Sequence, residues 1–261
     1  MSLLPAPLAP VRPAFLTKVT PAARLVAGFT WIIAAVVTLD PAVPARLTIA
    51  AIVALVLWSG LPLGRIPGRM APLGFAILSL TAFSILLSGS NTDRSLATVL
   101  ELGPVRVTGP AIAAGLAIGL RVVVIGLTTL LVVGPSDPTR LADSLVQQWH
   151  VPDRFAYGSL AALRVAPFMA GDWAVVGAAR RLRGLQPRGP IGRIHDAGGR
   201  ILVMLVSAIR RAERLALAMD ARGFDSGIRR THFRELRVGW RDWLTVAFAL
   251  AVAVAAIALP S

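Results

Sequence analysis

Long apolar runs without charge alternate with short polar stretches along most of this chain. A helix needs about 20 predominantly apolar residues to cross the hydrocarbon core of a bilayer, so each run predicts a membrane-spanning helix. The first run is short, and we expect Ala22, Ala23 and a snorkelling Arg24 to extend it. The five predicted spans are residues 25–39, 47–63, 70–92, 107–136 and 243–261. This pattern predicts an all-α polytopic membrane protein.

The region between the fourth and fifth spans, residues 135–241, is too long for a structureless loop in a compact protein. Its pattern predicts one short helix from about 138 to 149 and two long helices, from about 153 to 184 and from about 199 to 223. A break rich in proline and glycine at 187–190 separates the two long helices. The region therefore forms a helical segment of its own outside the spans.

The last of these helices is amphipathic. Its apolar residues recur at three- and four-residue steps, while Arg210, Arg211 and Arg214 lie off that face. Such a helix is too amphipathic to cross a membrane and too apolar to lie in water, so we expect its apolar side to be an interface. We define the apolar stripe by five residues: Ile201, Leu205, Ile209, Ala212 and Ala216.

Composition places the chain among membrane proteins, and the distribution of charge predicts its orientation. Apolar residues make up 56% of the chain, charged residues 15%, and the net charge is +14. Residues 135–241 hold 18 arginines against 9 acids, and basic loops lie on the cytoplasmic side of a membrane. We therefore expect this region, the N-terminus and the loop with Arg65 and Arg69 inside, and the C-terminus outside. The predicted outer loops carry Arg46, Arg94, Arg106, Asp40, Asp93 and Glu101.

Two features of the fourth span invite a functional interpretation. Arg121 lies at mid-membrane depth, where a charge disfavours insertion by about 2.5–3.5 kcal/mol, so it must face protein or water. It either lines a site for a partner or substrate, or pairs with a carbonyl or an acid inside the bundle. Gly115 and Gly119 form a pair of small residues that allows close helix packing, against a partner or within the bundle.

The residue types that carry catalysis are missing in the required patterns. The chain has no cysteine, which excludes disulfides, thiolate metal sites and cysteine nucleophiles. His150, His195 and His232 have no carboxylate or second histidine at metal-ligand spacing. Neither standard glycine-rich phosphate loop occurs. We therefore expect no catalytic residue, no metal site and no cofactor in this chain.

Two short triplets end the two long helices of residues 135–241: Leu182-Arg183-Gly184 and Ala221-Arg222-Gly223. Each can be an ordinary helix end, because arginine in the last turn complements the helix dipole and glycine supplies a left-handed cap. Each can also be a docking site, because an arginine at a helix tip can make forked hydrogen bonds to a carboxylate in a partner's pocket. If it docks, we expect Arg180, Arg181, Arg210 and Arg214 to be rim or lipid-facing charges.

These triplets resemble the paired Ala-Arg-Gly motifs of the transmembrane (T) component of energy-coupling-factor transporters, the EcfT/CbiQ family. Ala221-Arg222-Gly223 matches the second motif, and Leu182-Arg183-Gly184 aligns with the first, with leucine where alanine is usual. The similarity covers most of residues 16–260 and is strongest in the second half. Further similar segments are Leu16–Leu25, Ser136–Leu145, Leu163–Pro167 and Arg234–Asp242.

The resemblance implies a non-catalytic scaffold of an ATP-driven importer. In the family, the two arginines dock into two ATP-binding-cassette subunits, which hold ATP and Mg, and the membrane part holds a small S component that takes up vitamins or transition-metal ions. It implies ATPase docking by Leu182 to Gly184 and Ala221 to Gly223, and an S-component interface on the apolar stripe. The expected partners are two ATPases, an S component and the lipid bilayer, without nucleic acid.

The expected organisation is a flexible arm (1–18), four transmembrane helices (19–136), cytoplasmic coupling helices (137–239) and a last transmembrane helix (240–261). One alternative is a membrane-tethered, arginine-rich protein that binds nucleic acid or anionic lipid. A nucleic-acid binder would need aromatic residues among the cations, and residues 193–222 contain none. Another alternative, a carrier that transports alone, would need polar residues inside several spans, and Arg121 alone qualifies.

Overall fold

The computed structural model describes residues 12, 14–38, 40–62, 64, 66–91, 98–102, 105–185, 189–224 and 234–259. Within these residues, the chain divides into two compact units. The segment from Pro152 to Glu235 forms one of them, which we call the arm unit. The described residues up to Val151, together with those from Leu236 onwards, form the other, which we call the membrane unit. Most of the predicted N-terminal arm, Arg65, Asp93 and Arg94 lie outside the described residues.

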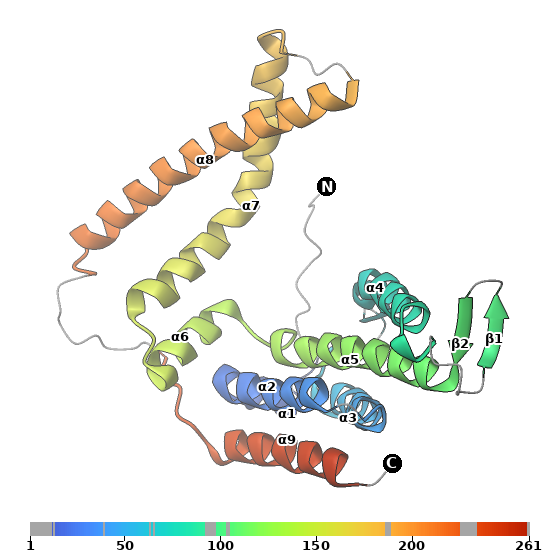
Figure 1. Ribbon diagram of the computed structural model, residues 1–261. Helices are drawn as coiled ribbons and strands as arrows, with labels where there is room; N and C mark the ends of the chain where they lie inside the picture. Colours follow the sequence, from blue (N-terminus) through green and yellow to red (C-terminus); the bar gives the residue numbers. More distant parts are fainter. Residues whose placement is uncertain are drawn as a thin grey trace. The chain divides into compact units, whose positions relative to one another are not determined.

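The membrane unit is built almost entirely of helices (Figure 1). Its helices are α1 (Phe15–Lys18), α2 (Pro21–Val37), α3 (Ala42–Trp58), α4 (Ile66–Leu86), α5 (Gly109–Val133), α6 (Pro138–Trp149) and α9 (Trp240–Ala258). Each of the five apolar runs forms one of these helices: α2, α3, α4, α5 and α9. The prediction of a multi-pass helical membrane protein is therefore confirmed in its main features.

Four stretches among the described residues are long and apolar enough to cross a membrane: Met70–Asn91, Gly109–Val133, Asp153–Leu182 and Trp240–Ala258. Helices α2 and α3 are apolar but shorter, at 17 residues each. The stretch Asp153–Leu182 belongs to the arm unit, where the sequence pattern predicted a long helix outside the spans.

Helix α5 lies at the centre of the membrane unit and packs against α2, α3 and α4, while α2 also packs against α9. Leu47 of α3 and Val124 of α5 are fully buried between these helices. The indole Nε1 of Trp31 donates a hydrogen bond to the carbonyl of Ala249, 3.0 Å away, and so joins α2 to α9. The outward apolar side chains remain exposed, as expected for helices that contact lipid.

Glycines on α5 allow a close approach of α4. A Cβ atom at Gly115 would lie 3.0 Å from the backbone oxygen of Thr81 and would clash with Ile85, and one at Gly119 would clash with the Thr81 hydroxyl. The pair therefore packs against a helix of the same chain, which is the second of the two interpretations of these residues.

A short β-hairpin between α4 and α5 was not predicted. Strands β1 (Thr98–Leu102) and β2 (Val105–Thr108) pair antiparallel, after a short helix η2 (Gly89–Asn91). The Asn91 side chain accepts a hydrogen bond from the backbone of Thr108 and donates one to the carbonyl of Ile85, so it ties β2 to the end of α4. The all-α prediction is wrong at this point, and the fourth span begins at Gly109 because Val107 and Thr108 belong to the hairpin.

Arg24 does not snorkel. Its side chain is 2% exposed and none of its three nitrogens has a hydrogen-bond partner among the described residues. It lies at the end of the first turn of α2, close to α6, α9 and the segment that precedes α2. Ser144 of α6 accepts a hydrogen bond from the backbone of Ala22, and Asp242 of α9 accepts one from the backbone of Thr20. These contacts hold the start of α2 inside the unit, so the Arg24 side chain is enclosed by protein instead of extending along the lipid-facing surface.

The arm unit consists of two long helices, α7 (Asp153–Leu182) and α8 (Gly189–Ala221), which cross each other (Figure 1). The boundaries of α7 agree with the predicted helix, but α8 begins about ten residues earlier than predicted. Pro190 is compatible with this start because proline fits the first turn of a helix, where its missing N–H is not needed. Asp196 then anchors these early turns to α7, as described below.

Candidate functional site

Helix α7 ends in a glycine cap that places Arg183 at the C-cap position. Gly184 has a φ of +76°, in the left-handed region that favours glycine. The N–H of Gly184 donates to the carbonyl of Arg181 (3.0 Å), and the N–H of Leu185 donates to that of Arg180 (3.1 Å). These two bonds define a Schellman motif.

Helix α8 ends in the same way. Gly223 has a φ of +73°, its N–H donates to the carbonyl of Asp220 (2.9 Å), and the N–H of Phe224 donates to that of Met219 (3.0 Å). Arg222 therefore occupies the same C-cap position as Arg183. The two triplets, 39 residues apart, share one backbone geometry as well as a sequence pattern.

The caps are completed by backbone groups, which leaves the two guanidinium groups available. Arg183 and Arg222 are both exposed, and neither side chain has a hydrogen-bond or ion-pair partner within the described part of the chain. The ordinary role of an arginine at a helix end, bonding to the last carbonyls, is therefore not used here. Leu182, which replaces the usual alanine, is 90% exposed and does not disturb the packing.

The two arginine-tipped ends lie far apart within the arm unit (Figure 1). Helix α8 has 33 residues, so it is about 50 Å long at 1.5 Å per residue. Residues 183–189 connect the end of α7 to the start of α8 and can span at most about 25 Å. The two ends are therefore at least roughly 25 Å apart, a separation that suits two docking partners better than one shared pocket.

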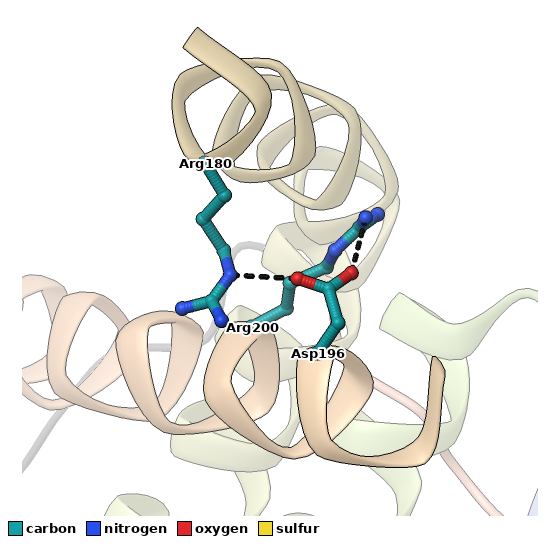
Figure 2. Close-up of polar contacts among 3 residues, drawn as sticks. All are labelled: Arg180, Asp196 and Arg200. Atoms are coloured by element: carbon teal, nitrogen blue, oxygen red, sulfur yellow. Dashed lines mark hydrogen bonds and ion pairs between the residues drawn. The ribbon is translucent and has the colours of Figure 1, made fainter. Parts of the chain in front are cut away.

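An ion-pair cluster holds α7 and α8 together where they cross (Figure 2). Asp196 of α8 accepts a hydrogen bond from Nε of Arg180 on α7 at 2.8 Å, and its other oxygen pairs with Arg200 on α8 at 2.5 Å. The guanidinium of Arg200 also lies over the ring of Trp173 on α7, 5.4 Å from its centroid. One carboxylate thus joins an arginine from each helix.

Two glycines make room for these arginines. A Cβ atom at Gly177 of α7 would lie 2.6 Å from Nη1 of Arg200, and one at Gly199 of α8 would lie 2.8 Å from both terminal nitrogens of Arg180. The Arg200 side chain of α8 therefore packs against Gly177 of α7, and the Arg180 side chain of α7 packs against Gly199 of α8. We call Gly177, Arg180, Asp196, Gly199 and Arg200 the crossing cluster.

A second ion pair, Arg211 to Asp172 at 3.0 Å, joins the helices further along α8. It is about one-third exposed at each partner, so solvent screening makes it weaker than the pairs of Asp196. With ties at two points, α7 and α8 can move as one body.

The crossing cluster depends on the ionised form of Asp196. The hydrogen bond from Arg180 holds the pKa of the Asp196 carboxyl below its ordinary value of 3.8, and Arg200 acts in the same direction. A lowered pKa contributes stability that is present above the ordinary value and is lost as the pH falls through the folded value. The α7–α8 crossing is therefore expected to be fully stabilised at neutral pH and to weaken below about pH 3.8.

We expect Asp196→Asn to loosen the crossing, because it leaves two arginines facing each other without an anion. The melting temperature should fall, and the fluorescence of Trp173, which lies under Arg200, should change. Asp172→Asn is the matched control, since it breaks the more exposed pair and should have a smaller effect on both. Equal effects of the two variants would show that the cluster contributes no more than an ordinary surface pair.

The apolar stripe lies on the side of α8 that faces away from α7. Asp196, Arg200 and Arg211 define the side facing α7, and at about 100° per residue Leu205 and Ile209 point roughly away from it. Ile201, Leu205 and Ile209 are 58%, 54% and 50% exposed. Ala212 and Ala216 are also exposed. The stripe is therefore not used for packing within the arm unit.

Arg121 in α5 is held by the end of a neighbouring helix. Its Nε donates to the carbonyl of Ala35 at 2.9 Å, and its Nη2 donates to that of Thr38 at 2.5 Å. Both carbonyls belong to the C-terminal end of α2, where backbone oxygens lack helical partners and carry partial negative charge. Arg46 of α3 does the same for α9, by donating to the carbonyls of Ala256 and Leu259. These contacts account for charged residues at membrane depth without a substrate.

Sequence reasoning missed the crossing cluster and misjudged one of its members. Arg180 was expected to be a rim or lipid-facing charge, and this is wrong, because it is paired with Asp196. The four-residue spacing of Asp196 and Arg200 was a visible signal of an ion pair on one helix. The partnership with Arg180 was not visible, because it depends on how two helices cross.

These features define a class: a multi-pass helical membrane protein with an arm unit that presents two matched arginine-tipped helix ends. Residues 14–233 match the CbiQ family, described as cobalt transport protein. The energy-coupling factor transporter transmembrane protein EcfT of Limosilactobacillus fermentum is 26% identical over 253 residues, which cover 93% of this chain and 91% of that protein. The protein of the same name from Listeria innocua is 28% identical over 238 residues, covering 87% and 86%.

A protein of Bifidobacterium longum named an ABC transporter ATP-binding protein is 28% identical over 171 residues. These residues cover 62% of this chain but 22% of that protein, so the similarity spans about a fifth of its length.

The chain belongs to the CbiQ family. The resemblance noted in the sequence is thereby confirmed: the chain is a transmembrane component of an energy-coupling-factor transporter, and a non-catalytic subunit.

Proposed function

We propose that this chain is the scaffold that couples two ATPase subunits to a substrate-binding S component in an importer of the energy-coupling-factor type. The observation that carries the proposal is the pair of Schellman ends, each with an exposed arginine at the C-cap and no partner among the described residues. In this proposal Arg183 docks into one ATPase and Arg222 into the other. Leu182, Gly184, Ala221 and Gly223 shape the two tips.

The chemistry of arginine supports this role. A guanidinium presents several donors in a planar fork and can bind a carboxylate through two parallel hydrogen bonds. The left-handed glycine that follows turns the chain away, so the arginine side chain can reach beyond the helix. The Bifidobacterium relative adds support, because a segment similar to this chain occurs there within a protein named for ATP binding.

The crossing cluster gives the arm a mechanical property that coupling needs. If ATP-driven closure of the ATPases moves the two tips, the ties through Asp196 and Asp172 let α7 and α8 move together rather than bend separately. The apolar stripe on the other side of α8 then moves with them. We propose that the S component binds this stripe, and that its displacement releases a vitamin or a transition-metal ion inward.

Of the helices, α2, α3, α4, α5 and α9 cross the membrane in this proposal, and α7 does not, although its length and composition would allow it. The crossing cluster supports the assignment, because α7 pairs through Asp172 and Arg180 with a strongly charged partner helix. Burying these charges in lipid beside α8 would be costly.

The test is assembly and transport with all parts present. A tagged chain co-expressed with two ATP-binding-cassette subunits and an S component should retain all three partners in mild detergent. The complex in liposomes should take up the S component's substrate when ATP is supplied to the ATPases. Substrate flux through the chain alone, without ATPases, would contradict the proposal.

We also expect the N-terminus and residues 135–241 on the cytoplasmic side and the C-terminus outside. The prediction rests on the 18 arginines against 9 acids in this region and on an odd number of spans. A reporter that works only outside the cytoplasm should be active when fused after Ser261. A fusion there that is active only in the cytoplasm would reverse the orientation.

A further inference from the structure

Arg24 presents a charge that the described residues do not satisfy. The side chain is 2% exposed, and its Nε, Nη1 and Nη2 have no hydrogen-bond partner in the described part of the chain. Removing a guanidinium from water without an acceptor is strongly unfavourable, and such groups usually indicate a missing water, ion or ligand.

The charged neighbours of Arg24 leave it uncompensated. Among the described residues, two charges act on it: Arg140 repels it and Asp242 attracts it. Both oxygens of Asp242 are already engaged, because Oδ1 accepts from the backbone of Thr20 and Oδ2 from that of Gly239, each at 2.7 Å. Two cations therefore face one carboxylate, so the position favours a further anion.

A cavity of about 170 Å³ adjoins Arg24 in the membrane unit. Its walls come from α1, α2, α3, α5 and α9 and are largely hydrocarbon and aromatic, as shown by Phe15, Trp58 and Phe248. Thr128 also lines it, and its hydroxyl is buried without a partner among the described residues. The cavity thus combines an apolar body with two unsatisfied polar groups.

The lining fits an amphiphile better than water. A buried water needs two to four polar partners, and the walls offer few. Apolar cavities of about 150 Å³ hold a molecule the size of benzene, so this one accommodates a short part of a hydrocarbon chain, and the rest would lie in the bilayer.

The depth of Arg24 also fits a lipid-like ligand. Asp242, which acts on Arg24, lies in the first turn of α9 between Trp240 and Trp243, which are 66% and 71% exposed. Exposed tryptophans at a helix end mark the membrane–water interface, where anionic headgroups lie. Arg24 is thus close to headgroup level.

We propose that this cavity binds an anionic amphiphile, with a phosphate or carboxylate on Arg24 and Thr128 and a hydrocarbon chain along the apolar walls. The source of the anion is either an anionic phospholipid or a free fatty acid, which share this chemistry. Reaching the guanidinium requires small shifts of the side chains that cover it. The cavity and the tips of the arm unit are formed by different residues. The proposal that the cavity binds an amphiphile therefore does not depend on the proposed transport function.

The test is native mass spectrometry of the full chain in mild detergent with three added probes. Dioleoyl phosphatidylglycerol and oleate are the anionic probes, and dioleoylglycerol, which has the same chains but no phosphate or carboxylate, is the uncharged one. We expect one anionic molecule to be retained at least about tenfold better than dioleoylglycerol, because hydrogen bonds to a charged group contribute strongly. Preference for phosphatidylglycerol or for oleate identifies the source.

The preference should disappear in Arg24→Gln and persist in Arg241→Gln. Arg241 is the matched control, since it lies at the same level but stacks on Trp240, 5.4 Å from its ring centroid, outside the cavity lining. Ala27→Leu adds three carbons to the cavity wall and leaves Arg24 in place, so it should also remove binding without changing the melting temperature. If Arg24→Gln does not fold, binding by the Ala27→Leu variant tests the proposal by itself. Equal retention of all three probes, or undiminished binding by a folded Arg24→Gln or Ala27→Leu variant, would overturn the proposal.

Discussion

Replacing Arg183 and Arg222 together by glutamate is expected to abolish co-purification of the ATPases and all ATP-driven uptake. Both arginines lie at the C-cap of a Schellman end with no partner among the described residues, so each is available to enter a partner's acidic pocket. Truncating one side of a buried charged pair costs about 2–5 kcal/mol, and reversing the charge adds repulsion. Because the two tips belong to one arm, both docking contacts are lost together.

The matched control is Arg210→Glu with Arg214→Glu. These two arginines are also exposed, lie on the same helix as Arg222, and change the net charge by the same amount. As exposed charges away from the tips they should contribute no more than about 1 kcal/mol each, so the complex should remain largely assembled. Equal loss in both double variants would mean that bulk positive charge is responsible and that the triplets are ordinary helix caps.

Placing aspartate at both Leu205 and Ile209 is expected to release the S component and leave the ATPases bound. Both residues are about half exposed and lie on the side of α8 away from α7, so the substitutions should not disturb the crossing cluster. An interface that buries them would have to bury two unpaired carboxylates, which is strongly unfavourable. Pull-down of each partner with the tagged chain, together with an uptake assay, measures the effect.

Val206→Asp with Leu217→Asp is the control for the stripe. Val206 and Leu217 are 44% and 69% exposed on α8 but point away from the stripe by roughly a third of a turn. We expect this variant to retain the S component. If the stripe variant keeps both partners and transports normally, the stripe is not the S-component interface.

Apolar runs in the sequence predict the helices of the membrane unit well, for a physical reason. A spanning helix must be apolar along its whole length, so its signal does not depend on its neighbours. The β-hairpin was missed because its second strand, Val105–Thr108, is short and its last two residues, Val107 and Thr108, continue without a charge into the apolar run of α5. The early start of α8 was missed because Gly189 and Pro190 usually indicate a break, although proline is also favourable in a first helical turn.

Charged residues are predicted less well, because their environment depends on tertiary structure. Arg24 follows a predicted helix start, where snorkelling is common, but contacts of Thr20 and Ala22 hold that start inside the bundle. The sequence indicates that the charge of Arg121 disfavours membrane insertion. Only the fold shows that its guanidinium donates hydrogen bonds to carbonyls at the C-terminal end of α2. The tips were found because a left-handed glycine after a helix is a local feature.

The most direct measurement of the central claim is site-specific crosslinking at the two tips. The chain contains no cysteine, so a single introduced thiol is unique and can carry a short photoreactive crosslinker. In membranes that contain the assembled complex, Arg183→Cys and Arg222→Cys should each form an adduct with an ATPase subunit, whereas Arg210→Cys and Arg214→Cys should form none. Adducts at Arg210→Cys or Arg214→Cys, with none at either tip, would contradict the assignment of coupling to Arg183 and Arg222.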